Sequence, residues 1–276
     1  MNNIMKKSIL LILILIVLII GINIITSVKE TKYSEYESGT INSSNAKALQ
    51  IDTNRITNLS ERTGNNVTAM TKIKNISKLN LSQIVLFYDE LDKNDNVVSD
   101  SKIDIDITLS PNDIMQVQFT PKDYTDSIEI TGYTYIAEDC SVVVNLKDNE
   151  TKTYENNKYL ENSKNYDVMS ISKDNNRAKQ NDLNFTIEIE NISDKNLGNI
   201  VLKVAEIDKN KEIVRVDHII YNSILKPEQK DKIISSLYDS HYDIKILGYT
   251  YDDMENKSNV DIDLITSKVN IVENGQ

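Results

Sequence analysis

Three side chains of this sequence belong to types that often carry chemistry: the single cysteine Cys140 and the two histidines, His218 and His241. The histidines lie 23 residues apart, and neither has the His-x-x-x-His or Glu-x-x-His spacing that holds a metal ion. Cys140 directly precedes Ser141-Val142-Val143-Val144, a context typical of a small apolar residue in a strand. One cysteine cannot form an intrachain disulfide. These side chains predict no catalytic residues, and we do not expect an enzyme.

Motifs for binding small ligands are equally weak. Asp92, Asn94 and Asn96 alternate as in a calcium loop, but Val97 stands where such a loop needs glycine and Ile103 where it needs glutamate. A turn between two strands is the simpler interpretation. The chain has 7 Gly in 276 residues and no Gly-rich phosphate loop, which argues against a nucleotide cradle. The sequence therefore predicts no metal site, no cofactor site and no small-molecule substrate.

The segments that position these residues repeat at a fixed offset of 116. The run Ile84–Val98 returns as Ile200–Val214 with 8 of 15 positions identical. Shorter motifs return at the same offset: Asn-Ile-Ser at 75 and 191, Leu-x-Pro at 109 and 225, and Gly-Tyr-Thr-Tyr at 132 and 248. Because one offset serves all of them, the copies have the same loop lengths and, we expect, one fold.

Each repeated motif has a structural interpretation beside a functional one. Asn75 and Ser77 can bond nearby backbone groups and stabilise a turn, and a glycan on Asn75 is the alternative. Tyr133 and Tyr135 are expected in the core, with an aromatic contact surface as the alternative. Gly132 is expected to relieve crowding or to bend its strand.

Both copies alternate apolar and polar residues with a period of two, most clearly at Ile103, Ile105 and Ile107. The fold predicted is all-β, with two tandem immunoglobulin-like antiparallel β-sandwiches behind one N-terminal transmembrane helix. The expected boundaries are 1–28 for a cytoplasmic tip and anchor, 29–47 for a flexible stalk, 48–148 for the first sandwich, 149–165 for a moderately mobile linker, 166–270 for the second sandwich, and 271–276 for a tail. An extra strand around Tyr33–Ile41 is the alternative for part of the stalk.

The N-terminal segment is strongly apolar. Ile9–Ile20 is uninterrupted, and the apolar stretch continues to Ile25 behind Lys6 and Lys7. A helix needs about 20 mainly apolar residues to cross a bilayer, so residues 8–25 predict an uncleaved membrane anchor, with a cleaved signal peptide as the alternative. The flanking lysines place the N-terminus in the cytoplasm and the modules outside the cell.

The rest of the chain is acidic. Lys6 and Lys7 are the only cations before residue 29, so the remainder carries 29 Lys and Arg against 42 Asp and Glu, a net charge of −13. Such a body is soluble and self-repelling. Nucleic acid is not expected as a partner, because no basic stripe is present to offset the phosphate charge.

A family resemblance follows from the order of motifs in the first copy. A strand ending in Lys74-Asn75-Ile76-Ser77, then Val85-Leu86-Phe87-Tyr88-Asp89, a hairpin, and Leu109-Ser110-Pro111 resemble the FxLYD-type domains of bacterial surface proteins and lipoproteins. The second copy departs from this pattern with Val204-Ala205 in place of Tyr88-Asp89. The resemblance implies an extracytoplasmic immunoglobulin-like sandwich behind a membrane anchor, and it transfers no catalytic residues.

The functional hypothesis is a bacterial cell-envelope protein whose two modules bind another envelope protein or act as a spacer. Binding of cell-wall glycan is the alternative, and an exported enzyme is a third hypothesis. We expect specific function to lie where the copies differ: Phe87-Tyr88-Asp89 against Lys203-Val204-Ala205, Cys140, and the two histidines.

Overall fold

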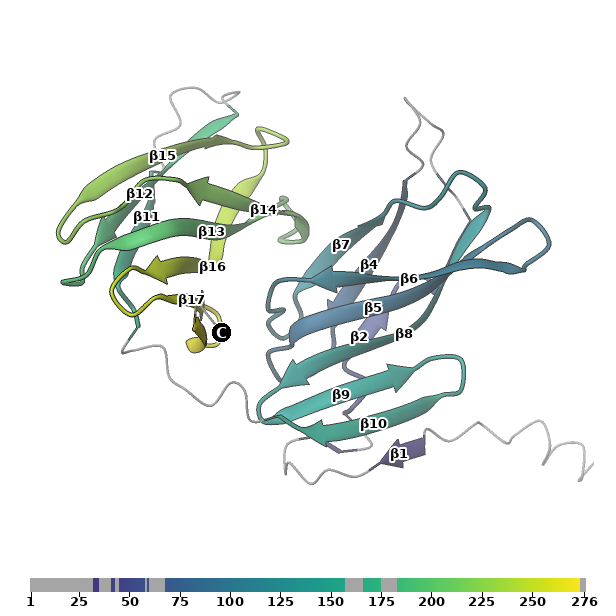
Figure 1. Ribbon diagram of the computed structural model, residues 1–276. Helices are drawn as coiled ribbons and strands as arrows, with labels where there is room; N and C mark the ends of the chain where they lie inside the picture. The colour runs from purple at the N-terminus through teal and green to yellow at the C-terminus, as the bar shows by residue number, and fades with distance from the viewer. Residues whose placement is uncertain are drawn as a thin grey trace, which may run out of the picture.

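The computed structural model describes residues 32–34, 41–42, 45–57, 59, 68–156, 166–174 and 183–273. Regular structure in these residues is β throughout, in strands β1 to β18, which confirms the all-β prediction (Figure 1). The predicted anchor, residues 8–25, lies outside the described residues. In the described part, no helix is long and apolar enough to span a membrane.

The first module comprises the described residues of 32–156 and has two facing sets of strands. One sheet runs in the order β1 (Lys32–Ser34), β10 (Glu150–Glu155), β9 (Cys140–Asn145), β8 (Ser127–Ala137), β5 (Ser82–Leu91) and β6 (Val97–Ile105), with β3 (Arg55–Ile56) also paired to β8. The other set is β2 (Leu49–Ile51), β4 (Ala69–Asn75) and β7 (Ile114–Phe119). All pairings within the module are antiparallel except β1 with β10.

The second module comprises the described residues of 166–273 and repeats this plan. One sheet holds β11 (Met169–Asp174), β12 (Asn184–Asn191) and β15 (Lys230–Ser236). The facing strands are β18 (Lys268–Glu273), β17 (Ser258–Asp263), β16 (Asp243–Asp253), β13 (Leu197–Ile207) and β14 (Ile213–Tyr221).

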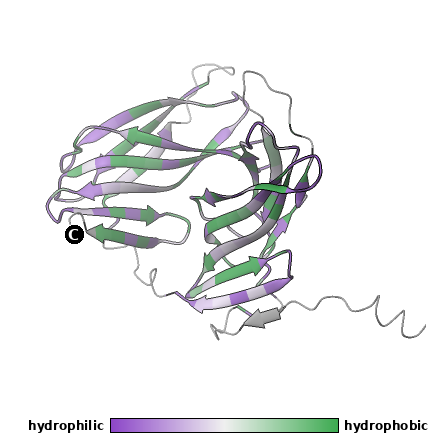
Figure 2. Cartoon of the chain, turned by 45° about the vertical axis from the view of Figure 1, so that its right-hand side comes forward, coloured by the Kyte–Doolittle hydropathy of each residue, from purple (hydrophilic) through white to green (hydrophobic). Residues whose placement is uncertain are grey.

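The alternation of the sequence becomes the two faces of each sheet, as the colour changes along the strands of Figure 2 show. In β4, Ala69, Thr71 and Ile73 are buried, and the residues between them are more exposed. Each module buries its own apolar cluster, and the fully buried Ile84 and Ile200 occupy matching places in the two clusters.

The Asn-Ile-Ser motif is a turn built on a buried asparagine. Asn75 is fully buried, and its amide group donates to the carbonyls of Leu79 (2.7 Å) and Leu109 (2.9 Å). Its side-chain oxygen accepts from the backbone and the hydroxyl of Ser77. Asn191 makes the same four bonds in the second module. The turn interpretation is confirmed, and burial makes the folded Asn75 inaccessible to a glycan.

The Gly-Tyr-Thr-Tyr segments lie in β8 and β16, and their four tyrosines are at most 2 % exposed, as the core interpretation predicts. The strand register shifts at Gly132 and at Gly248, so both mark bulges. A Cβ atom at Gly132 would lie 2.6 Å from the carbonyl oxygen of Val144, and Gly248 faces Ile262 in the same way. Glycine is needed here for close approach of two backbones.

Strands also form in three segments that the sequence assigned to irregular structure. Glu150–Glu155, predicted as linker, is β10 and pairs with β9 along its whole length. Its inward residues are Thr151 and Thr153, which are buried but polar, so no apolar alternation marks the strand. Lys32–Ser34 of the predicted stalk is β1, and β18 extends to Glu273 in the predicted tail. The structure therefore has strands in parts of the predicted stalk, linker and tail, and β1 overlaps the alternative strand around Tyr33–Ile41.

Candidate functional site between the modules

The residues flagged for chemistry do not assemble into one site. His218 lies on β14 beside Asp106, whereas His241 lies in the turn before β16 and pairs with Asp239. Cys140 is fully buried at the start of β9, and burial raises the pKa of its thiol. Among the described residues, no group of three His, Cys, Asp or Glu side chains is placed to hold a metal ion.

The segment from Asp92 to Asn96, whose spacing resembles a calcium loop, forms a hairpin turn, and its own backbone bonds to the carboxylate of Asp92. One carboxylate oxygen of Asp92 accepts from the backbones of Asn94 (2.8 Å) and Asn96 (2.9 Å). These bonds, with the side chain of Asn96 first, lower the pKa of Asp92. Asp208 makes the matching backbone bonds in the second module. The turn interpretation is therefore confirmed in both copies.

A direct contact joins the two modules, and the sequence did not predict it. Ala205, Ile213 and Leu247 of the second module are buried in the apolar cluster of the first module. Three partly buried side chains of the second module pack against the same cluster: Ile207, Val216 and Ile265. The outer face of the β13–β14–β16 sheet thus has a buried apolar centre, which stabilises the contact by removing apolar surface from water.

Backbone and charge contacts frame this apolar centre. Ile213 on β14 pairs in parallel with Met115 on β7, which links the sheets of the two modules at one residue pair. Lys72 on β4 forms a 2.7 Å ion pair with Glu212. This hydrogen bond and the charge of Glu212 outweigh desolvation and raise the pKa of Lys72.

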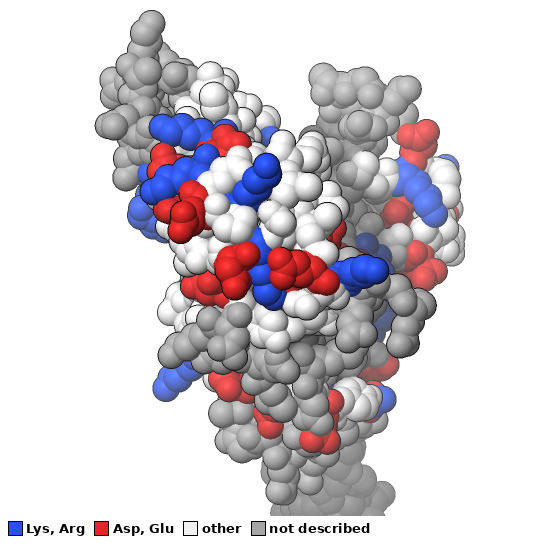
Figure 3. All heavy atoms as spheres, turned by 60° about the vertical axis from the view of Figure 1, so that its left-hand side comes forward, with Lys and Arg blue, Asp and Glu red and all other residues white. Residues whose placement is uncertain are grey.

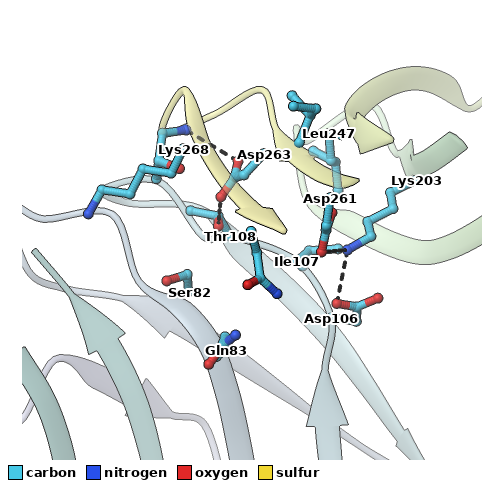
Figure 4. A pocket seen from close by; sticks show the side chains of 14 residues that line it. Ser82, Gln83, Asp106, Ile107, Thr108, Lys203, Leu247, Asp261, Asp263 and Lys268 are labelled. Carbon is cyan, nitrogen blue, oxygen red and sulfur yellow. Dashed lines mark hydrogen bonds and ion pairs between the residues drawn. The ribbon is translucent and has the colours of Figure 1, made fainter. Parts of the chain in front are cut away.

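A polar groove opens beside the apolar contact, and both modules line it (Figure 4). Lys203 on β13 reaches from its own module to Asp106, at 3.1 Å, and also bonds Asp261 on β17 at 3.2 Å. The hydroxyl of Thr108 donates to the carboxylate of Asp263 across the groove. These bonds connect the two modules across the groove, whereas the buried hydroxyl of Thr266, which also lines the groove, has no hydrogen-bond partner.

The charges in the groove are strongly coupled. Burial opposes the charge on Lys203, but the carboxylates of Asp261 and Asp106 outweigh it and raise the pKa of Lys203. The hydrogen bond with His218 outweighs desolvation and lowers the pKa of Asp106. Burial raises the pKa of Asp261, although Lys203 opposes that shift. The Lys203–Asp106 ion pair joins the two modules, whereas Lys203 and Asp261 both belong to the second module.

The strand registers of the two modules show how this face of the second module differs from that of the first. Lys203 and Phe87 occupy matching positions, since each pairs with the bulge glycine of the next strand. Two residues farther along, the first module has the ion pair Asp89–Lys147, and the second has Ala205 and Ile265. An ion pair on the outer face of one module is replaced by an apolar pair on the other, where the neighbouring module covers it.

Some of the residues that differ between the two copies lie in the contact between modules, and others do not. Lys203, Ala205 and His218, which have no identical counterparts in the first copy, all lie in the contact between modules. His241 does not lie in this contact, and Cys140 belongs to the core of the first module. The sequence carried a signal for the contact: Ala205 and Leu247 place apolar residues where the first copy has Asp89 and Thr131. The match of Ile265 to Lys147 follows only from the strand registers, in which Asp263 and Asn145 pair with the two bulge glycines.

The sequence matches no protein-family model and no curated protein. Solved structures align only distantly. A red sea bream transglutaminase is 10 % identical over 83 % of this chain, with a TM-score of 0.22. A chaperone–tip adhesin complex of CFA/I fimbriae is 11 % identical over 72 % of this chain and 98 % of its own, with a TM-score of 0.17. The chain spans about a third of the transglutaminase, with 32 % of that protein covered.

Proposed function

We propose that this protein is a membrane-anchored extracytoplasmic spacer at the bacterial cell envelope, whose two acidic modules form one body and present a surface to another envelope protein. The observation that carries the proposal is the contact between modules, with Ala205, Ile213 and Leu247 buried in the neighbouring core. A spacer must hold its ends at a fixed separation, and a buried apolar contact serves that role better than a flexible linker.

Location and family form part of the same proposal. Residues 8–25 would anchor the chain with the N-terminus in the cytoplasm and both modules outside. The order of strands supports an immunoglobulin-like sandwich of the FxLYD type, because β2, β4 and β7 face β5, β6, β8 and β9 across a shared core.

The surface chemistry favours a protein partner over a glycan. Acidic and basic side chains are interspersed on the face in Figure 3. Ion pairs of the second module include Lys230–Glu190 and Lys173–Asp243. Sugars stack on exposed aromatic rings, but the tyrosines of both Gly-Tyr-Thr-Tyr segments are buried. Tyr124, Tyr154 and Tyr238 are exposed on three separate elements and form no shared row along one strand.

Topology is tested by labelling with a membrane-impermeant maleimide in intact cells. In a Cys140→Ala background, Lys209→Cys at the exposed β13–β14 turn should react before lysis. Asn3→Cys should react only after lysis. Labelling of both sites, or of neither, before lysis would reject the proposed orientation.

The binding role is tested by cross-linking intact cells and purifying the full chain. We expect a specific envelope protein, which should be lost from a chain lacking residues 8–25. Recovery of wall glycan alone would favour the alternative, and recovery of nothing specific would leave only the spacer role.

A further inference from the structure

Ile213 belongs by sequence to the second module but is buried in the first. It is the first residue of β14, it is 3 % exposed, and it lies in the apolar cluster of the first module. Its counterpart in the first copy, Val97, is the first residue of β6 and is 56 % exposed. Both copies thus begin this strand with a β-branched apolar residue, and only the one in the second module is covered by a neighbouring module.

The segment that begins β14 makes three kinds of contact with the first module. The carboxylate of Glu212 forms a 2.7 Å ion pair with Lys72 on β4. The backbone of Ile213 pairs in parallel with Met115 on β7, and Val216 packs against the same apolar cluster. A charge, a backbone and an apolar side chain of one extended segment are all engaged. Peptides that add to the edge of a sheet are bound by contacts of these kinds.

The part of the first module that receives this segment is the side of its sandwich between β6 and β7. These two strands belong to different sheets and do not pair with each other in the described part of the chain. Ile105 on β6 and Val117 on β7 lie in one apolar cluster with Ile213. The core of the first module is therefore completed on this side by a residue of its neighbour.

The second module closes its corresponding side with its own residues. There, the hydroxyl of Tyr221 on β14 donates a 2.7 Å hydrogen bond to Asp231 on β15. At the offset of 116, the first copy has Ile105 and Met115 in their places, and this apolar pair cannot form such a bridge. The need for a segment from outside is thus particular to the first module.

The start of β14 fills this side only in part. One residue pair joins β14 to β7, although β7 has six residues. A cavity of about 230 Å³ remains between the strands, lined by residues that include Ile105 on β6, Gln116 and Val117 on β7, and Val216 and His218 on β14. A longer strand could therefore pair with more of β7 than β14 does. Contacts between domains of one chain permit relative motion unless they are large and apolar.

We propose that this side of the first module is a binding site for an extended strand of a partner protein, and that the start of β14 occupies it as a built-in competitor. The proposal rests on the binding role proposed above and names the chemistry of the partner. Its strand carries an acidic residue directly before a β-branched apolar residue, as Glu212 and Ile213 do in this chain. The docked chain is the closed form, and binding exchanges the β14 segment for the strand of the partner.

The test uses the chain's own segment as the probe. A fluorescent peptide of residues 209–218 is titrated with the purified full-length chain, and binding is measured by fluorescence anisotropy. Ala205→Asp places an unpaired carboxylate in the contact between modules and should open it without changing the first module. We expect at least tenfold tighter binding to this variant than to the native chain, because the tethered segment competes at a high effective concentration.

Peptide variants separate this site from non-specific binding. A peptide with Ile213→Asp would place a carboxylate in the apolar cluster and should bind the opened chain at least tenfold more weakly. Adding Lys72→Glu to the opened chain should weaken the binding of the native peptide. A peptide with Glu212→Lys should recover binding to that chain, because the charges are then exchanged.

Leu247→Asp on β16 is a second opening variant, with circular dichroism to show folding and small-angle scattering to show opening. Three results would each overturn the proposal: equal binding of the native peptide to native and opened chains, no saturable binding to either opened chain, or equal binding of the Ile213→Asp peptide. Partner capture from cells does not depend on these results, since a partner bound at another surface would still be recovered. The two proposals can therefore fail separately.

Discussion

The outer sheet faces of the two modules begin from one strand plan and carry opposite chemistry at matching positions. The first module keeps the ion pair Asp89–Lys147, and the second has Ala205 and Ile265 against its neighbour. The side of each sandwich also differs. In the first module, Met115 on β7 pairs with Ile213 of the neighbouring module. In the second module, the matching residue Asp231 accepts a 2.7 Å hydrogen bond from Tyr221 of its own module. One module is built to be docked upon, and the other closes its corresponding side with a polar pair.

This difference resembles the capping of repeat proteins, in which the terminal unit has a more polar outer side. Tyr221 and Asp231 sit at the positions of Ile105 and Met115 in the first module. Burial, with Asp231 adding to it, raises the pKa of Tyr221 to about 12, and the same hydrogen bond lowers the pKa of Asp231. A third module docked in the same way would have to break this hydrogen bond.

The largest effect is expected where the modules agree. Asn75→Ala and Asn191→Ala each remove four hydrogen bonds of a buried side chain, and each such bond contributes about 1 kcal/mol to stability. We expect a loss of about 4 kcal/mol in the unfolding free energy of the affected module, measured by urea denaturation. Ser77→Ala, which removes only one hydroxyl, should cost less. A module that tolerated its Asn→Ala change would break the claim of a shared scaffold.

The difference between the outer faces can be tested by transplanting the ion pair. Ala205→Asp buries an unpaired carboxylate in the contact between modules, which costs about 3–5 kcal/mol. We expect the modules to separate, with a larger radius of gyration in small-angle scattering. Adding Ile265→Lys recreates the pair of the first module. The double variant should recover the stability of the second module and remain undocked; a docked double variant would contradict the proposed role of Ala205 and Ile265.

At the two bulges we expect a smaller loss of stability, of the same size in both modules. Gly132→Ala and Gly248→Ala push a Cβ atom against the carbonyl of the next strand, and overpacking of this kind costs about 1–3 kcal/mol. Thermal unfolding of the full chain should show matching decreases. Gly198→Ala is the control, since its Cβ would meet the flexible end of Met254. A Gly198→Ala effect as large as the other two would argue against backbone crowding as the cause.

The smallest effect concerns pH. The folded pKa of Asp106 is lowered, so its contribution to docking is present above the ordinary carboxyl pKa of about 4 and is lost as the pH falls through the lower, folded value. Asp261 has a raised pKa and acts in the opposite direction. Small-angle scattering of the native chain should show weaker docking near pH 3 than at pH 6. Asp106→Asn should flatten this change, and an unchanged profile would exclude Asp106 as its source.

The strand plan could be predicted from the sequence because burial follows period-two alternation and because two copies agree. Ile103 and Ile105, the tyrosines of both Gly-Tyr-Thr-Tyr segments, and the Asp92 turn all lie where those patterns place them. β10 escaped prediction because Thr151 and Thr153 are buried without being apolar. β1 was only the alternative interpretation of the stalk, because three residues of a polar segment show no period-two alternation.

The contact between modules could not be predicted from either copy alone. It depends on two different surfaces, and only their three-dimensional placement shows that Ala205 meets the core of the first module. Its trace in the sequence is the change from Asp89 to Ala205 at a position that alternation assigns to an outer face. Apolar substitution of an outward position in one copy of a repeat is therefore a signal of docking between copies.

The parallel pairing of β1 with β10 has a mechanical consequence. The chain enters β1 at Lys32, beside Glu150, and leaves β10 at Glu155, toward the opposite end of the ladder. Tension applied between the N-terminal segment and the second module therefore pulls the two strands along their length in opposite directions. Such a load acts in shear, and the three residue pairs of the ladder must give way together instead of opening one by one. The short pairing of β1 with β10 is thus oriented to resist tension along the chain.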